Sequence, residues 1–177
     1  SAYLHAWVTT GDERYRRVTE ETLDYMLREL RLPEGGLASA QDADTDGVEG
    51  LTFTWTAEEL EAVLGGAQPD WLLPFEHGRS ILRGGIPEDA RATLLAVREG
   101  RPQPLRDDKA LASWNGLALA ALAEAGARLE RPDYVEAAIG VAQFLLGPLS
   151  DGGGRLLRSF RAGEARIPAY LEDYANV

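Results

Sequence analysis

The 177-residue chain contains no cysteine and only two histidines. Without cysteine it has no disulfide, no thiolate nucleophile and no cysteine-ligated metal site. Thiol redox chemistry is therefore excluded for this chain.

Long apolar runs are also missing. The longest run, around Gly116 to Ala123, is too short to cross a bilayer. The sequence does not begin with the basic residues followed by an apolar stretch that are typical of a signal peptide. We therefore expect no membrane contact and a soluble, cytoplasmic protein.

Basic residues are few: 18 Lys and Arg stand against 29 Asp and Glu, which gives a net charge of −11. A chain with this balance repels phosphate backbones, so nucleic acid is not an expected partner. What the sequence does have is a 45% apolar share in which Leu and Ala recur at helical spacing. This pattern predicts helices packed on helices.

The two ends of the sequence are both helical in pattern. SAYLHAWVTTG opens with apolar residues already in helical register and has no clear N-cap, while YLEDYANV stops within an amphipathic turn. We expect an excised fragment of a longer protein, forming one partial domain over residues 1–177.

The acidic stretch DADTDGVEG at 42–50 has three interpretations. Asp42, Asp44, Asp46 and Gly47 copy the first half of a helix-loop-helix calcium site, but Phe53 stands where the bidentate carboxylate is required. The alternatives are a plain acidic turn and a loop that lines a functional cleft. Because the calcium pattern is incomplete, we predict no metal site.

Apolar spacing predicts helices over 12–30, 57–64, 87–99 and 133–146, and one from Asp107 or Asp108 to Leu129. Thr56 and Glu59 form a capping box for the second of these. Residues 35–56 are predicted to form a small hairpin or an extended segment, and residues 67–86 a short helical turn and a loop.

An internal repeat appears when Tyr15 is laid over Tyr134. Gly35 then falls on Gly154 and Leu37 on Leu156, after helices that also match. Such self-similarity is typical of stacked helical hairpins, since one hairpin cannot bury its own apolar face. The alternative is a chance match between two amphipathic helices. In this alignment the acidic stretch at 42–50 follows the end of the first helical hairpin.

The segment RDDKALASWNGLALAALAEAG, from Arg106 to Gly126, carries the most candidate chemistry. Its helix is nearly apolar all round, yet it includes Asn115 and Gly116, which are poor helix formers. Either a buried hydrogen bond from Asn115 and a close helix crossing at Gly116 compensate, or a ligand stacked on Trp114 approaches the helix near its start.

The polar residues that precede this helix are equally open to two interpretations. Arg106, Asp107, Asp108 and Lys109 either cap the helix and pair among themselves, or offer carboxylate and cation to a polar substrate. His5 on an apolar helix and His77 in a loop are more typical of structural than of catalytic histidines.

GGLASAQDADTDGVEGLTFTWTAEEL, RDDKALASWNGLALAALAEAG, GRLLRSFRAGEA and YLEDYANV resemble, in this order, the C-terminal part of a thioredoxin-domain-containing family. This family includes spermatogenesis-associated protein 20 and the bacterial YyaL-like proteins. The resemblance implies an all-α fold: a fragment of an α/α toroid, like those of six-hairpin glycosidases and N-acylglucosamine 2-epimerases, with small β-hairpins between helical hairpins. It also implies, as partners, the remaining helices of the toroid and a thioredoxin-like domain.

The resemblance further implies a carbohydrate-acting or carbohydrate-binding function, without a cofactor. Glycoside hydrolysis requires two carboxylates that face one bond, and the candidates are Asp108 with Asp173 or Asp44. The candidate substrate-binding residues are Trp114, Asn115, Lys109, Arg106, Tyr174 and Asp42. Epimerisation by proton transfer favours a histidine pair, which the two histidines here do not readily supply. The alternative is a non-enzymatic scaffold or interaction domain in which these polar residues hold the hairpins together.

Overall fold

The computed structural model describes residues 1–66 and 70–177, which form two compact units. The first unit comprises Ser1–Ala40 and Arg106–Val177, and the second comprises Gln41–Leu105. The partial domain expected over 1–177 stays a prediction, and within this range the chain divides into these two units.

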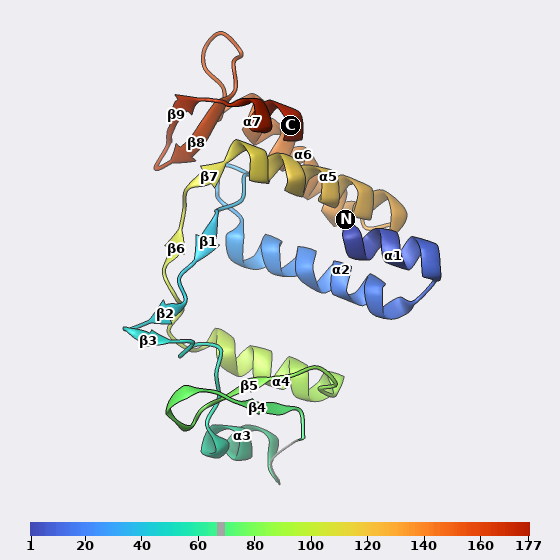
Figure 1. Ribbon diagram of the computed structural model, residues 1–177, viewed down its shortest axis with the longest axis vertical. Coiled ribbons are helices and arrows are strands. Elements are labelled where there is room, and N and C mark those ends of the chain that lie inside the picture. Colours follow the sequence, from blue (N-terminus) through green and yellow to red (C-terminus); the bar gives the residue numbers. More distant parts are fainter. Residues whose placement is uncertain (67–69) are drawn as a thin grey trace. The chain divides into compact units, whose positions relative to one another are not determined.

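The first unit is built from two helical hairpins (Figure 1). Its helices are α1 (Ala2–Thr10), α2 (Glu13–Tyr25), α5 (Ala112–Arg128), α6 (Pro132–Leu146) and α7 (Leu171–Asn176). A π-helical turn (Met26–Leu30) directly follows α2. Asp12 caps α2 by accepting a hydrogen bond from the Arg14 amide. The apolar faces of α1, α2, α5 and α6 meet in one core, which includes Leu4, Leu23, Leu122, Tyr134, Val141, Phe144, Leu145 and Leu149.

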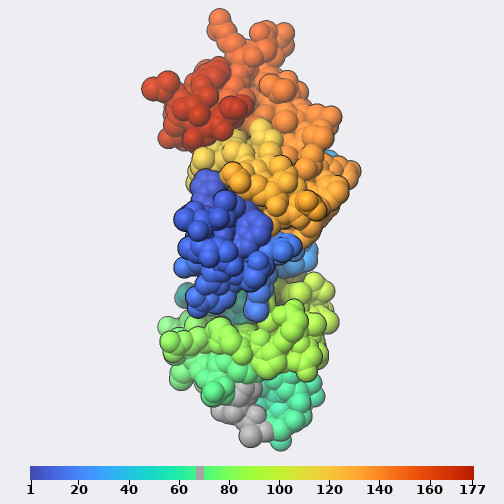
Figure 2. All heavy atoms as spheres, turned by 90° about the vertical axis from the view of Figure 1, so that its right-hand side faces the viewer, coloured from blue at the N-terminus to red at the C-terminus, as the bar shows by residue number. Residues whose placement is uncertain are grey.

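Polar contacts join the α1–α2 hairpin to one side of the α5–α6 hairpin. His5 Nε2 lies 2.9 Å from the Glu124 carboxylate, and the buried Tyr134 hydroxyl donates to Asp24 at 2.7 Å. Burial and the neighbouring Asp24 carboxylate raise the pKa of Tyr134. In Figure 2 the blue surface of α1 adjoins the yellow and orange surface of α5 and α6. The predicted packing of helices on helices is confirmed.

The internal repeat extends to individual backbone hydrogen bonds. After the first hairpin, Ala38 N donates to Leu30 O, and after the second, the aligned Leu157 N donates to Leu149 O, both at 2.8 Å. The isolated bridges Arg31↔Leu37 and Ser150↔Leu156 also align. Chance similarity between two helices does not explain matching bonds outside the helices, so the repeat is real.

Each helical hairpin is followed by short strands, as predicted. In the second copy, β8 (Leu157–Arg161) and β9 (Glu164–Pro168) form an antiparallel hairpin whose turn residues, Ala162 and Gly163, have positive φ. Ahead of α5, β7 (Ala110–Leu111) pairs with β8. In the first copy, β1 (Ala40–Gln41) and β6 (Arg106–Asp107) lie where the chain leaves and re-enters the first unit.

The second unit has a small core of Trp55, Leu60 and Leu94. Its elements are β2 (Asp44–Thr45), β3 (Val48–Glu49), α3 (Ala57–Leu64), β4 (Leu72–Pro74), a 3₁₀ turn (Glu76–Gly78), β5 (Ser80–Leu82) and α4 (Glu88–Glu99). The Arg101 guanidinium lies 3.8 Å from the Trp55 ring centroid. The predicted capping box is confirmed: Thr56 and Glu59 exchange both hydrogen bonds.

Two element predictions need correction. Residues 72–82, expected as a turn and loop, contain the antiparallel β4–β5 pair; residues 67–69 of that predicted stretch lie outside the described part. The long helix starts at Ala112, not at an Asp107 or Asp108 cap, because β6 and β7 occupy the preceding residues. Leu111 precedes α5 and supplies no side-chain cap.

Candidate functional site

The start of α5 gathers most of the predicted site residues, and Asn115 is the most deeply placed. It is 1% exposed. Its Oδ1 accepts from the Leu37 amide at 2.7 Å, while its Nδ2 donates to Leu37 O at 3.1 Å and to Leu111 O at 2.9 Å. The side chain thus exchanges hydrogen bonds with both backbone groups of Leu37, as a neighbouring β-strand would. This attaches the turn at Gly36 and Leu37, which follows the first helical hairpin, to α5.

Gly116 provides the close approach that its presence in an apolar helix suggested. A Cβ at this position would clash with the carbonyl oxygen of Asn176, at the end of α7. One turn earlier, Ser113 Oγ accepts from Asn176 Nδ2 at 2.7 Å. The structural interpretation of Asn115 and Gly116 is confirmed, and the helix that crosses at Gly116 is α7.

Asp173, a predicted catalytic carboxylate, lies within this α5–α7 contact and is 1% exposed. Its Oδ1 accepts from the Ser113 amide at 3.2 Å, and its Oδ2 accepts from the Tyr170 amide at 2.8 Å and from Arg158 at 3.2 Å. Both oxygens therefore bind protein donors. Asp173 supplies the first-turn hydrogen bonds of both α5 and α7, which is a structural task.

The polar run before α5 is paired, largely within itself. Arg106 forms an ion pair with Asp108 and also donates to the carbonyl oxygens of Glu29 and Arg31, at the end of the first hairpin. Lys109 pairs with Asp107 at 3.1 Å, and its hydrogen bonds hold the pKa of Asp107 below the usual value. Arg106 thus stabilises a helix carboxyl end, while Asp108 stays half-exposed.

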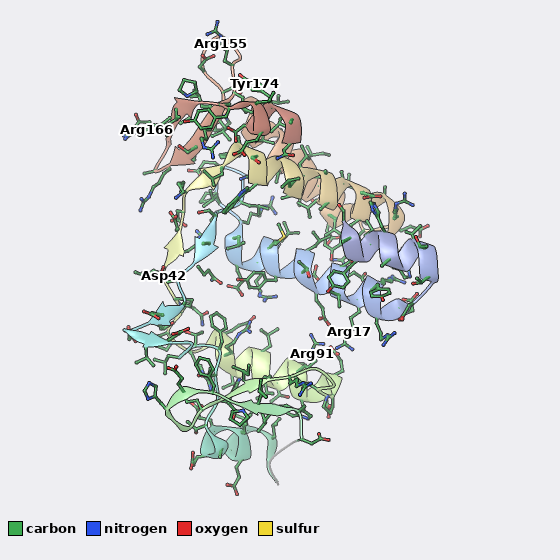
Figure 3. All side chains as sticks on the ribbon, viewed as in Figure 1. Arg17, Asp42, Arg91, Arg155, Arg166 and Tyr174 are labelled. Atoms are coloured by element: carbon green, nitrogen blue, oxygen red, sulfur yellow. The ribbon has the colours of Figure 1, made fainter. Side chains whose placement is uncertain are left out.

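The aromatic candidates differ from the polar ones because they face solvent. Trp114 on α5 and Tyr174 on α7 are each 54% exposed. Figure 3 labels Tyr174. An exposed indole at the start of a helix is a surface on which a sugar ring or another apolar face can stack.

Asp42, labelled in Figure 3, and Asp44 belong to the second unit. The acidic stretch is a tight hairpin: Asp44 pairs with Glu49 and Thr45 with Val48, across Asp46 and Gly47, both of which have positive φ. The described residues contain no group of three carboxylates or histidines that could hold a metal ion.

One hollow was missed by sequence reasoning. Trp7, Val8, Gly11, Glu13 and Arg128 line an open depression of about 540 Å³ in the first unit. The Trp7 indole N–H donates to Glu13 at 3.0 Å, so an aromatic ring, a carboxylate and a guanidinium converge there. Trp7 lies in the opening apolar stretch, but no local pattern shows that Arg128 joins it.

Sequence comparison places the chain among known proteins. No family model matches it. Human spermatogenesis-associated protein 20 is 31% identical over 237 residues, which cover 99% of this chain and 30% of the human protein. The mouse protein of the same name is 30% identical over 236 residues, with the same coverage. The chain is a homologue of part of spermatogenesis-associated protein 20. The predicted family resemblance is thereby confirmed.

The relatives are much longer than this chain, which spans about 30% of spermatogenesis-associated protein 20. Because the aligned stretch of 237 residues exceeds the 177 residues of the chain, at least 60 positions of the alignment have no counterpart here. An uncharacterized protein of Caenorhabditis elegans is 25% identical over 97% of the chain.

Among solved structures, the cellobiose 2-epimerase of Spirochaeta thermophila is 16% identical over 99% of this chain and 48% of the epimerase chain, with a TM-score of 0.31. In the described part of the chain no helix is long and apolar enough to cross a membrane.

Proposed function

We propose that this chain is a helical scaffold, in which two stacked hairpins support the neighbouring segments of a longer protein. The observation that carries the proposal is the burial and hydrogen bonding of the Asp173 and Asn115 side chains. Both are 1% exposed, and their side-chain oxygens accept hydrogen bonds from groups of the protein itself. A glycosidase acid or nucleophile must reach its substrate, whereas buried and fully bonded side chains stabilise a fold.

Paired substitutions of Asp173 and Asp108 test the scaffold role. Asp173→Asn removes the charge opposite Arg158 and turns one acceptor into a donor facing a backbone amide, so we expect the free energy of unfolding to fall by about 2–4 kcal/mol. Asp108→Asn breaks only an exposed ion pair with Arg106, and a change below about 0.5 kcal/mol is expected.

Urea denaturation of both variants and the parent chain provides the measurement. Equal stability of the two variants would contradict the scaffold role of Asp173. So would an Asp173→Asn variant that keeps its stability and loses binding of a ligand, because that behaviour belongs to a binding site.

Carbohydrate binding is a second candidate function, and the exposure of Trp114 favours it. Half of this indole is free on the surface, and the half-exposed Asp108 offers a carboxylate from the run that leads into the same helix. A flat aromatic ring with polar groups nearby suits a sugar, which presents an apolar face and hydroxyl edges.

Thermal unfolding against a panel of mono- and disaccharides tests this candidate. We expect one class of sugar to raise the melting temperature, and Trp114→Ala to abolish that shift while the ligand-free melting temperature stays within a few degrees, as is usual for a surface substitution. Trp7→Ala is the matched control, because Trp7 lies in the separate hollow. Loss of the shift in Trp7→Ala alone would move the site there, and the absence of any shift would remove the carbohydrate candidate.

A further inference from the structure

The open hollow of the first unit lies where the α1–α2 turn meets the end of α5. Gly11 belongs to this turn, Glu13 begins α2, and Arg128 is the last residue of α5. Trp7 and Val8 add an apolar wall from α1. The volume of about 540 Å³ is typical of sites that hold small molecules.

The second copy of the repeat builds the same helical hairpin without the hollow's aromatic ring and carboxylate. In the repeat alignment Trp7 falls on Gly126, and Glu13 falls on Pro132. A Cβ built on Gly126 would lie 2.7 Å from Val135 Cγ2, so the second hairpin is closed where the first holds an indole. The hollow is therefore a property of the first copy and not a consequence of the hairpin fold.

One end of the hollow carries negative charge. Glu13 Oε1 accepts the Trp7 indole N–H at 3.0 Å, and Glu13 Oε2 lies 3.7 Å from Arg16. The carboxyl end of α1 reaches the hollow at Gly11, and α1 has no basic residue in its last turn. The partial negative charge of the last α1 carbonyls therefore adds to that of Glu13, and both favour an ammonium group.

The Arg128 guanidinium brings positive charge to the same hollow. Its Nε donates to Glu124 Oε1 at 3.0 Å, and its side chain is 47% exposed. A guanidinium has five N–H donors in a planar fork, so the bond to Glu124 leaves other donors for a second carboxylate. Arg128 can thus bind a carboxylate without releasing Glu124.

We propose that the hollow binds a free α-amino acid with an apolar side chain. The ligand carboxylate pairs with Arg128, its ammonium group with Glu13, and its side chain packs against the Trp7 ring. One guanidinium and one carboxylate match a zwitterion, whereas an ion of single charge would face a like charge. An apolar protein segment laid over the hollow would take both charges out of water without a partner, which is costly.

A titration with L-phenylalanine, followed by ¹H–¹⁵N NMR, tests the proposal. The chain has four tryptophans, and the indole resonance that disappears in Trp7→Phe is that of Trp7. L-phenylalanine should move this resonance with half-saturation at roughly 1 mM, because a ligand of this size in an open hollow binds weakly. N-acetyl-L-phenylalanine amide keeps the side chain and lacks both charges, so it should leave the resonance in place.

Two charge-removing variants test the assigned contacts. Glu13→Gln keeps an oxygen that accepts the indole N–H, and Arg128→Gln keeps a helix-forming residue at the end of α5. Each loses one charge-assisted hydrogen bond to the ligand and should weaken L-phenylalanine binding about tenfold or more. Arg17→Gln is the matched control: Arg17, labelled in Figure 3, pairs with Glu21 on α2, and its variant should bind as the parent does.

Three results would each overturn the proposal. The first is a Trp7 resonance that does not approach saturation by about 20 mM L-phenylalanine. The second is an equal movement with the uncharged amide, and the third is equal weakening in Arg17→Gln and Arg128→Gln. The site is separate from Trp114 and from the scaffold role, so none of these results alters the sugar panel or the unfolding test of Asp173.

Discussion

At the residue scale, the two copies of the helical hairpin use different residues for the same backbone turn. Gly11, which joins α1 to α2, has φ +69°, and the aligned Glu130, which joins α5 to α6, has φ +54°. Glycine adopts this left-handed region freely, whereas a residue with a Cβ pays roughly 1–2 kcal/mol for it. The first copy thus has the unstrained form of a turn that is strained in the second.

This difference predicts substitutions of opposite sign. Glu130→Gly should raise the free energy of unfolding by about 0.5–1 kcal/mol, because the relief of strain exceeds the extra entropy that glycine gives the unfolded chain. Gly11→Ala should lower it by about 1 kcal/mol, and no atom within 4 Å of the new Cβ adds a steric cost. Urea denaturation of both variants is the measurement. If both changes had the same sign, backbone strain would not be the cause.

At the scale of elements, the joint between α5 and α7 depends on Gly116. Backbone atoms of Asn176 and Val177 occupy the place where any other residue would carry a Cβ. Because backbone cannot move aside as a flexible side chain can, α7 must shift as a whole when this space is filled.

Gly116→Ala should therefore weaken the attachment of α7, although alanine favours the helix itself. We expect the free energy of unfolding to fall by about 1–3 kcal/mol, and limited proteolysis near Tyr174 to accelerate. Gly152→Ala is the matched control, since a Cβ there meets nothing within 4 Å and should leave both measurements unchanged. Equal proteolysis of the two variants would show that α7 is not held at Gly116.

The same joint explains which predictions from sequence succeed. The helical hairpins and the repeat were predictable because they follow a local apolar pattern. Asn115 and Gly116 were predictable as special positions because they interrupt that pattern. The start of α5 was not, because β7 is two residues long and its partner Phe160 is far along the chain. For the same reason, no local pattern shows that Ser113 and Arg158 enclose Asp173. A candidate carboxylate is therefore identified by sequence, but its accessibility only by structure.

At the scale of the whole molecule, the repeat shows how the second unit is joined to the first. Where the second copy turns from β8 to β9 through Ala162 and Gly163, the first copy passes through residues 41–105 before returning. The exit and the return lie close together on each side of the boundary: Ser39 N donates to Asp107 O in the first unit, and Asp42 N donates to Leu105 O in the second. The second unit is thus an insertion in a β-hairpin, a position at which chains tolerate additions.

Excision of this insertion is the corresponding prediction. Replacing residues 43–104 by Asn-Gly, a pair suited to two-residue hairpins, should leave a first unit that unfolds in one cooperative transition, because its core of buried residues draws only on residues outside the excised stretch. Urea denaturation should give a smaller m-value, in proportion to the lost surface, and a free energy of unfolding within about 2 kcal/mol of the parent chain.

The isolated second unit, residues 41–105, provides the reciprocal test. Among the described residues of this unit, the buried apolar core comprises Trp55, Leu60 and Leu94, so we expect the unit to be marginally stable alone. Loss of cooperative unfolding in the excised chain would mean that the first unit requires the second in order to fold. A cooperative transition in the excised chain, with the Asp173→Asn penalty preserved, would instead locate the scaffold in the paired hairpins, since every partner of Asp173 lies outside the insertion.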